Sequence, residues 1–520
     1  MVEEQQEEIK TKNNGEEYLR VENLVTRFFT SKGIVKALDG VTLAVKKGEI
    51  FGLVGESGCG KSVTATSIMD LIPDPPGRII SGSIYIDNYN ILNDLPKLAR
   101  INVKSETDVR VKRNKRLIKR HNFVISKIRG RKIAMIFQEP SLALNPVISI
   151  GKQISENILL HNRVEIANSI IRRESLTQED VRNFYNEIRG TKGDFRPLVN
   201  KWTRQYAVPV AEDEIVNILK SGADSALTLK ELTEVIMGKK RGNELTHITT
   251  MRDYYKREEE LFELTLKLVE AESKNEVNNA AVLEQQIEYL SYSLKKDFSS
   301  FIWKRRLLGK RFEVVFEEEA RRRGIELLTL VNIAEPGRVY DAYPHELSGG
   351  MQQRAMIAMA IASNPMMLIA DEPTTALDVT TQAQILDLIR DLNKVTGTSV
   401  LFITHDLAVI AEMCERLGVM YAGNLVEEGP ASELFNNPLH PYTTGLLSSI
   451  PRADVKSRNE IKLESIPGSV PNLISPPTGC RFHPRCKFKM DICAEKKPAL
   501  VEVQKNHKVA CFLYSKEVVN

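Results

Sequence analysis

Short runs of consecutive apolar residues alternate along this chain with segments in which apolar residues recur every three or four positions. Residues 50–54 form one such run and predict a buried strand, and residues 63–71 follow with a helical pattern. Two more strand-like runs, 367–370 and 400–403, lie among helical patterns far along the chain. The alternation predicts an α/β fold with a largely parallel sheet and helices on its faces.

Residues 163–312 differ from the rest of the chain, because charged residues are dense there and apolar residues recur with helical periodicity. Two sets of apolar positions each line one face of an expected helix: Leu261, Leu264 and Leu268 in the first, and Leu283, Ile287, Leu290 and Leu294 in the second. The polar stretch 273–275 indicates a turn between them. We therefore expect a helical insertion that contains a hairpin with a short coiled-coil-like seam. Thr228, followed three positions later by Glu231, predicts the start of another helix.

The size and composition of the chain limit its class. With 520 residues, of which 42% are hydrophobic, it is long enough for two or three globular domains. No stretch approaches 18 consecutive apolar residues, and residues 1–18 are polar, which indicates a disordered tail rather than a signal or transit peptide. A cytoplasmic location is therefore the default expectation. The formal net charge of +4 is too small to imply a polyanionic partner.

Residues 100–132 are locally basic. They hold thirteen Lys and Arg residues against Glu106 and Asp108. A solvated insertion explains such a segment, and so does contact with an anionic membrane surface or with an acidic segment of a partner.

A glycine-rich loop follows the first predicted strand and matches the pattern G-x-x-x-x-G-K-[ST], which wraps nucleotide phosphates. Glycine allows the backbone to turn so that successive N–H groups point at anionic oxygens. Lys61 adds a positive charge, and Ser62 offers a hydroxyl to Mg²⁺. The other residues expected around the phosphates are Gly55, Glu56, Ser57, Gly58, Cys59, Gly60 and Val63.

Polar residues that follow the other predicted strands complete a candidate hydrolytic site. Asp371 and Glu372 end one strand, where Asp371 would hold Mg²⁺ and Glu372 would polarise the attacking water. His405, at the parallel position one strand over, would donate a hydrogen bond to the γ-phosphate. Gln138 follows a further apolar run, and its neutral amide suits a magnesium ligand that also positions water.

A second anion-binding element lies at residues 347–353, Leu-Ser-Gly-Gly-Met-Gln-Gln, ahead of a helix. Its candidate ligands are Ser348, Gly349, Gly350 and Gln352. Only the first phosphate loop comes with a lysine and carboxylates. The second element therefore suits a nucleotide that is held by another subunit.

With these motifs in this order, the chain resembles the nucleotide-binding subunits of ATP-binding cassette (ABC) transporters. The loop at 55–62 resembles Walker A, residues 366–372 resemble Walker B with its catalytic glutamate, and residues 347–352 resemble the signature sequence. Gln138, Asp378 and His405 lie where the family has its Q-, D- and H-loops. Phe28 lies where the family has an adenine-stacking aromatic residue, although a core phenylalanine, with neighbouring Phe29 as the competitor, also fits.

The resemblance extends to the oligopeptide/dipeptide importer branch through residues 138–146, 343–347 and 440–443. Four cysteines at the C-terminus share in it: Cys480, Cys486, Cys493 and Cys511. In a cytoplasmic protein such a cluster indicates a metal rather than disulfides. The branch is associated with a [4Fe–4S] cluster; Zn²⁺ or no metal are the alternatives.

The resemblance implies an ATP- and Mg²⁺-dependent hydrolase that powers peptide import from the cytoplasmic face of the cell membrane. Its expected partners are a second ATPase subunit, identical or paralogous, two membrane permeases and an extracellular solute-binding protein, with no nucleic acid. We expect an ATPase domain at 19–435, interrupted by the 100–132 and 163–312 insertions, and a C-terminal region at 436–520. Import of oligosaccharide or nickel, or an ABC-type ATPase that acts on DNA, are the alternatives.

Overall fold

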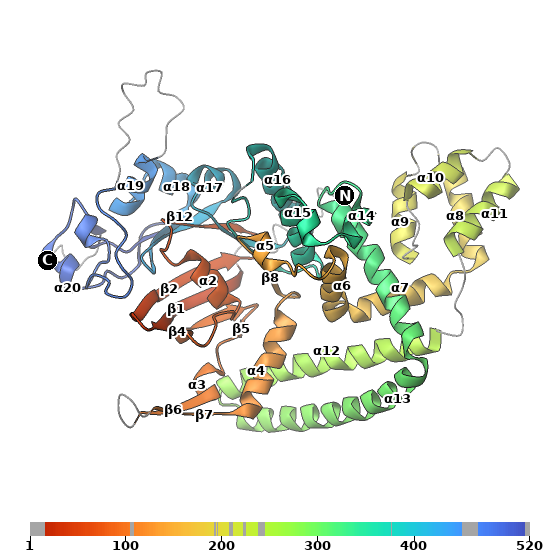
Figure 1. Cartoon of the computed structure of the whole chain (residues 1–520), viewed down its shortest axis with the longest axis horizontal. Helices are drawn as coiled ribbons and strands as arrows, with labels where there is room; N and C mark the ends of the chain where they lie inside the picture. Colours follow the sequence, from red (N-terminus) through yellow and green to blue (C-terminus); the bar gives the residue numbers. More distant parts are fainter. Residues whose placement is uncertain are drawn as a thin grey trace, which may run out of the picture. The chain divides into compact units, whose positions relative to one another are not determined.

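The computed structural model describes residues 16–103, 109–191, 194, 196–206, 212–221, 225–237, 245–375, 377–449 and 466–514. The chain divides into two compact units. Met1–Asn145 together with His345–Asn520 make the first, which we name the sheet unit. Pro146–Pro344 make the second, which we name the helical unit (Figure 1).

The sheet unit is built on an eight-stranded sheet in the order β13-β14-β12-β11-β3-β10-β9-β8. Its central block runs parallel and comprises β11 (Arg416–Tyr421), β3 (Ile50–Val54), β10 (Ser399–Ile403), β9 (Met367–Asp371) and β8 (Ile133–Ile136). Every residue of β3, β8, β9 and β10 is buried, as expected for strands covered on both faces. The prediction of a largely parallel sheet is confirmed. An antiparallel edge extends it: β12 (Asn424–Pro430), β14 (His507–Val509) and β13 (Val501–Gln504).

A smaller antiparallel sheet has the order β2-β1-β4-β5. Its strands are β1 (Glu17–Thr30), β2 (Gly33–Lys46), β4 (Gly77–Ile86) and β5 (Tyr89–Asn90). Strand β1 begins at Glu17 and buries Tyr18, whereas we expected the tail to run to residue 18. Residues 1–15 of that tail lie outside the described residues.

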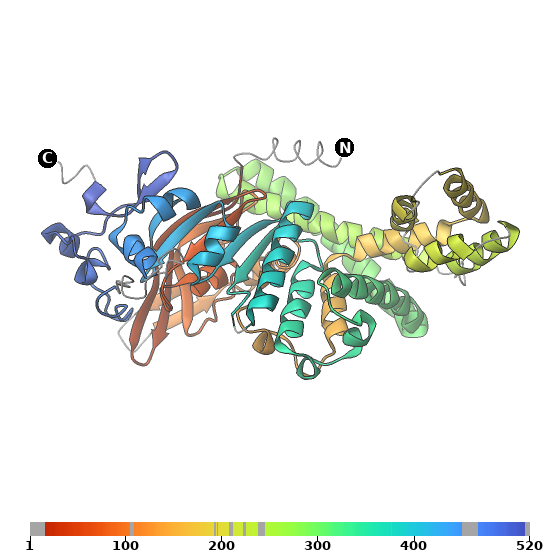
Figure 2. The ribbon, with the colours of Figure 1, turned by 90° about the horizontal axis from the view of Figure 1, so that it is seen from above.

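Helices of the sheet unit lie beside the large sheet, which Figure 2 shows from above. They are α2 (Lys61–Ile68), α5 (Pro140–Ala143), α15 (Gly349–Ile361), α16 (Val379–Thr396), α17 (Leu407–Met413), α18 (Ala431–Asn436) and α19 (Pro441–Ser448). Among the described residues beyond α19, the chain forms strands β13 and β14 and the short helical elements η3 (His483–Arg485), α20 (Asp491–Glu495) and η4 (Phe512–Tyr514). Across the described residues, no helix combines the length and the apolar character needed to cross a bilayer.

The basic segment at residues 100–132 belongs to the sheet unit and, with the residues just before it, is folded into helices and a hairpin. This part of the chain contains α3 (Leu95–Leu98), the hairpin of β6 (Ala99–Val103) with β7 (Val109–Arg113), and α4 (Lys115–Ile128). Asn114 caps α4 by accepting a hydrogen bond from the backbone N–H of Leu117. The helix buries one apolar face, and two of its polar side chains pair with carboxylates, Arg120 with Asp94 and His121 with Asp70.

The helical unit is formed by α6 (Ile150–His161), α7 (Arg163–Ser175), α8 (Gln178–Gly190), α9 (Arg196–Tyr206), α10 (Glu212–Ser221), α11 (Ser225–Met237), α12 (Leu245–Ser273), α13 (Val277–Leu330) and α14 (Pro336–Asp341). Helices α8 to α11 share a core of their own with the end of α7, in which Phe184 stacks on Trp202 with ring centroids 4.1 Å apart. The predicted helix start at Thr228 is wrong, because α11 already begins at Ser225.

The predicted hairpin is confirmed as α12 and α13, which pack against each other and are joined by a turn at 274–276. Its seam buries Leu268, Ala271 and Leu283, with Leu264, Ala280 and Ile287 packed alongside. Leu290 and Leu294 are also buried, so all four apolar positions predicted for the second helix lie on its packed side.

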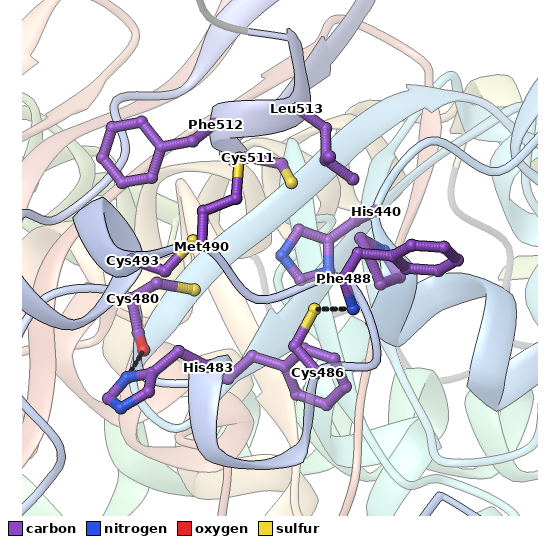
Figure 3. Close-up of a pocket in the computed structure, with 12 residues that line it drawn as sticks. His440, Cys480, His483, Cys486, Phe488, Met490, Cys493, Cys511, Phe512 and Leu513 are labelled. Carbon is purple, nitrogen blue, oxygen red and sulfur yellow. Dashed lines mark hydrogen bonds between the residues drawn. The ribbon is translucent and has the colours of Figure 1, made fainter. Parts of the chain in front are cut away.

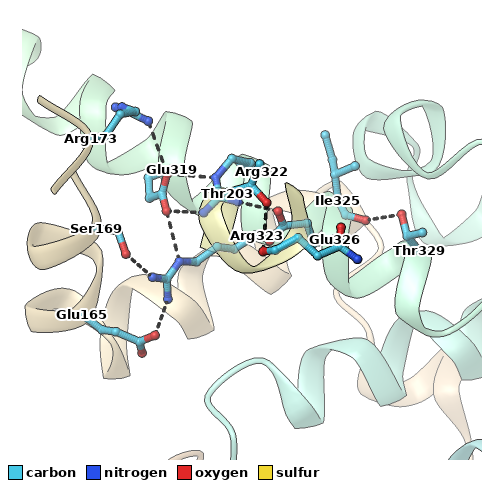
Figure 4. A network of polar contacts seen from close by, with 11 residues as sticks. Glu165, Ser169, Arg173, Thr203, Glu319, Arg322, Arg323, Ile325, Glu326 and Thr329 are labelled. Atoms are coloured by element: carbon cyan, nitrogen blue, oxygen red, sulfur yellow. Dashed lines mark hydrogen bonds and ion pairs between the residues drawn. The ribbon is translucent and has the colours of Figure 1, made fainter. Parts of the chain in front are cut away.

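A buried carboxylate joins α13 to α7 (Figure 4). The side chain of Glu319 has no exposed surface and pairs with three arginines, Arg173 at 3.5 Å, Arg322 at 2.6 Å and Arg323 at 3.3 Å. Arg323 also pairs with Glu165 and donates a hydrogen bond to the Ser169 hydroxyl, both on α7. These contacts hold α7 to the final part of α13.

We predict that Glu319→Ala destabilises the helical unit, because it leaves several arginines facing one another without their shared anion. Breaking such a pair should lower the free energy of unfolding by about 3–5 kcal/mol. Urea unfolding followed by tryptophan fluorescence measures the change, since Trp202 and Trp303 both lie in this unit. The control is Glu335→Gln, which removes an exposed ion pair with Arg338 and should have little effect. Equal stability of the two variants would contradict the prediction.

Candidate active site

The glycine-rich loop lies between β3 and α2, with its backbone packed tightly on neighbouring strands. Gly55, Gly58 and Gly60 have positive φ angles, of 153°, 77° and 109°. A Cβ added at Gly55 would lie only 2.2 Å from the carbonyl oxygen of Met420 on β11, so a side chain has no room there. The backbone N–H of Gly423 donates to the carbonyl of Cys59 at 2.7 Å, which ties the loop to the turn after β11.

Lys61 is buried at the start of α2 with its ammonium turned back into the loop. It donates to the carbonyl oxygens of Gly55 at 2.8 Å and Glu56 at 3.3 Å. The helix begins at Lys61, two residues earlier than predicted, so the N–H groups of its first turn belong to Lys61, Ser62 and Val63. Free N–H groups at a helix start, next to a lysine, favour phosphate.

Ser62 meets Asp371, which ends β9 two strands away. The hydroxyl of Ser62 donates to the Asp371 carboxylate at 3.1 Å. Burial raises the pKa of Asp371 to about 6, an effect that the hydrogen bond from Ser62 opposes. A hydroxyl and a carboxylate at this distance form an oxygen donor set of the type that Mg²⁺ prefers.

Glu372 is the point at which the predicted hydrolytic residues meet. One carboxylate oxygen accepts from the amide of Gln138 at 2.9 Å and from the hydroxyl of Thr375 at 3.1 Å. The other lies 3.2 Å from Nδ1 of His405. The backbone of Glu372 adopts a positive φ of 46°, and its N–H donates to the carbonyl of Ile403 at the end of β10. Sequence reasoning missed Thr375, which the turn Glu-Pro-Thr-Thr directly after the strand could have indicated.

The second anion-binding element, residues 347–353, forms the start of helix α15. Ser348 is the N-cap residue and accepts a hydrogen bond from the N–H of Met351, while Gly349, Gly350 and Gln352 lie in the first turn. Gln353, buried just beyond, donates to the carbonyl of Pro373 at 2.6 Å and so connects this helix to the turn after Glu372. Asp378 caps α16 by accepting from Thr381, and these hydrogen bonds lower the pKa of Asp378.

Phe28 and Phe29 lie near the end of β1 and differ in their surroundings. The ring of Phe28 is partly buried and covers Gly77 on β4, where an added Cβ would come within 2.7 Å of it. Phe29 is 49% exposed. Adenine stacking by Phe28 stays a prediction.

The four C-terminal cysteines line one small cavity of about 20 Å³ (Figure 3). None is in a disulfide, and burial raises the pKa of Cys480 and Cys511 to about 11 and that of Cys486 above its usual value. In the described part of the chain, no three His, Cys, Asp or Glu side chains stand close enough to hold a metal ion. His483, which could be a further ligand, is bonded within its own turn, where its Nδ1–H donates to the carbonyl oxygen of Cys480 at 2.9 Å.

His440, the first residue of the 440–443 motif, lines the same cavity, a position that the sequence did not predict. Burial lowers its pKa to about 3, so its imidazole is neutral at physiological pH. Its Nδ1 accepts a hydrogen bond from the backbone N–H of Tyr442 at 3.0 Å.

A phosphate loop between a buried strand and a helix, with an Asp-Glu pair at the end of a parallel strand, defines a P-loop nucleoside triphosphatase. Residues 38–192 and 232–375 match the family described as ABC transporter, and residues 426–493 match the oligopeptide/dipeptide transporter C-terminal region. The chain belongs to the ABC transporter ATPases and carries the C-terminal region of the oligopeptide/dipeptide branch. It is therefore an ATP-hydrolysing enzyme that uses ATP with Mg²⁺, and the family predicted from the sequence is confirmed.

Curated relatives align with the chain over almost its full length. The probable peptide ABC transporter ATP-binding protein y4tR of Sinorhizobium fredii is 33% identical, with 96% of each chain covered. The oligopeptide transport ATP-binding protein AppD of Bacillus subtilis is 32% identical, over 96% of this chain and 97% of its own. The dipeptide transport ATP-binding protein DppD of the same organism is 31% identical, over 96% and 95% respectively.

We predict that Gly55→Ala disrupts the phosphate loop far more than Gly58→Ala. Both positions have a positive φ, which costs an alanine about 1 kcal/mol. Only Gly55 adds a clash with backbone, since a Cβ at Gly58 meets nothing within 4 Å. Thermal unfolding of the two full-length variants measures the difference. Equal melting temperatures would show that the loop is not wedged against β11.

Proposed function

We propose that this chain is the ATP-hydrolysing subunit of an importer for peptides. It would work at the cytoplasmic face of the cell membrane with a second ATPase subunit, identical or paralogous, two membrane permeases and an external solute-binding protein. The peptide and oligopeptide names of its full-length relatives support this cargo, as does the matched C-terminal region. Oligosaccharide or nickel cargo would be the competing outcomes in an uptake assay.

The observation that carries the proposal is the set of contacts around Glu372. A carboxylate that is fixed by Gln138 and Thr375 and that faces His405 is oriented for general-base work, because it has little freedom to turn away from a bound water. Ser62, Asp371 and Gln138 would hold Mg²⁺, which neutralises charge on the phosphates when bound. His405 would donate to the γ-phosphate, and Lys61 would exchange the loop carbonyls for phosphate oxygens.

Ser348, Gly349, Gly350 and Gln352 would complete the site of the partner ATPase subunit. A helix start with a serine and two glycines presents N–H groups to an anion at close range. The nucleotide would then be bound from both sides in the closed pair, and loss of the γ-phosphate would release it. Asp378 stands at the start of the neighbouring helix α16, where it would face the same interface.

We predict that Glu372→Gln lowers steady-state ATP turnover about 100-fold or more, in line with loss of a general base. Mg·ATP should still bind, because Lys61, Ser62 and Asp371 are intact. The measurements are phosphate release by the assembled transporter and nucleotide binding by the purified subunit, with Glu412→Gln on the exposed ion pair to Arg390 as the control. Normal turnover in Glu372→Gln would remove Glu372 from the catalytic role.

We also propose a metal centre at Cys480, Cys486, Cys493 and Cys511. Four free cysteines line one cavity, and thiolates are ligands of both iron–sulfur clusters and Zn²⁺. In the structure these side chains do not stand close enough together to hold a metal ion, so binding a [4Fe–4S] cluster or Zn²⁺ would require them to move. The cluster is the form that the importer branch favours, and its role would be structural or regulatory.

We predict that protein purified without oxygen contains about four iron and four sulfide per chain. Cys486→Ser should lose most of this iron, whereas Cys414→Ser, at a buried cysteine outside the cavity, should keep it. Iron, zinc and acid-labile sulfide analysis measures the content. One zinc per chain without sulfide would show that the site binds Zn²⁺ instead of a cluster. Protein that contains neither iron nor zinc would contradict the proposal.

A further inference from the structure

Glu56, the second residue of the phosphate loop, makes hydrogen bonds through its backbone N–H, its carboxylate and its backbone carbonyl. Its backbone N–H donates to the hydroxyl of Tyr442 at 3.0 Å. Its carboxylate accepts two hydrogen bonds from Arg485, at 2.8 Å and 3.2 Å. Its carbonyl accepts from Lys61, so no polar group of this residue is left without a partner.

Both side chains that reach Glu56 come from the C-terminal part of the chain and are themselves firmly placed. Tyr442 is fully buried, with its ring 4.6 Å from that of Tyr421 and 5.4 Å from that of Phe482. Arg485 is buried too, and its Nε donates to the carbonyl of Pro467 at 2.9 Å. Such side chains act as fixed supports rather than as surface contacts.

The charge of Glu56 gives these contacts a consequence for the ligand. A carboxylate in a loop that binds a polyanion opposes binding through charge repulsion, which grows as the two charges approach. The two-pronged contact from Arg485 neutralises the carboxylate and fixes its direction. Tyr442 fixes the adjoining peptide group.

We propose that Arg485 and Tyr442 are positioning residues of the nucleotide site, through which the C-terminal region sets the affinity of the phosphate loop for ATP and ADP. The inference rests on the proposed nucleotide-binding role of that loop. Both supports begin beside the cysteine cavity. Arg485 directly precedes Cys486, and Tyr442 is bonded to His440, which lines the cavity.

The test is calorimetric binding of Mg·ATP and Mg·ADP to the purified full-length chain. Arg485→Gln should raise the Kd for both nucleotides about tenfold or more, as expected when a charge-assisted hydrogen bond is lost. Tyr442→Phe, which keeps the ring in place, should raise Kd about threefold or more. In steady-state kinetics the loss should fall on KM, with kcat at saturating ATP changed by less than about twofold.

A double variant tests whether Arg485 acts by offsetting the charge of Glu56 or only by packing against the loop. Adding Glu56→Gln to Arg485→Gln removes the unpaired carboxylate, so part of the lost affinity should return, and Arg485→Lys should retain more affinity than Arg485→Gln. The matched controls are Arg390→Gln on α16 and Tyr514→Phe on η4, which should bind both nucleotides like the parent chain. Unfolding midpoints of all variants are compared, and Tyr442→Phe decides the case if Arg485→Gln does not fold.

Unchanged Kd values in both Arg485→Gln and Tyr442→Phe would overturn the inference. So would a double variant that recovers nothing, because the carboxylate would then not be what Arg485 offsets. Failure of the parent chain to bind Mg·ATP would instead overturn the proposed function.

Discussion

The register of four parallel strands decides where every charged group of the site lies. Strands β8, β9, β10 and β3 pair side by side, and all of them end at the same edge of the sheet. The residues that follow these strands therefore lie together at that edge: Gln138, Glu372, His405 and the phosphate loop. A shift of one strand by a single residue would turn its side chains to the other face of the sheet. The contacts to Glu372 exist only because the pairing between these strands is exact to one residue.

Much of this arrangement could be predicted from the sequence, because a buried parallel strand appears in it as a short run of consecutive apolar residues. The runs at 50–54, 367–370 and 400–403 are strands within one residue of their predicted limits. The phosphate loop and the Asp-Glu pair are also recognisable, since their chemistry requires particular residue types at fixed spacing. The helical hairpin followed from the periodicity of the apolar residues at 261–268 and 283–294 and from the polar stretch at 273–275, although its full length did not.

Other features could not be predicted, because they depend on contacts between distant parts of the chain. His440 reaches the cysteine cavity through the fold, and the 440–443 motif that contains it did not indicate that position. Thr375, by contrast, could have been inferred from the turn after β9. The antiparallel edge of the sheet joins β12 to strands 70 residues and more further on, and short strands such as β14 carry little periodicity. The error at Thr228 arose because a capping pattern also occurs by chance within a helix, where packing decides the outcome.

Helix α13 runs without interruption from the tip of the hairpin to the part of the helical unit that holds Glu319. Its 54 residues follow about 80 Å of helix axis at 1.5 Å per residue. Such a rod works as a lever arm. A rotation of about 5° at its C-terminal end would sweep the opposite end through about 5 Å or more, by simple geometry on that length. Small rearrangements near one end of this helix are thereby magnified into displacements the size of a side chain at the other.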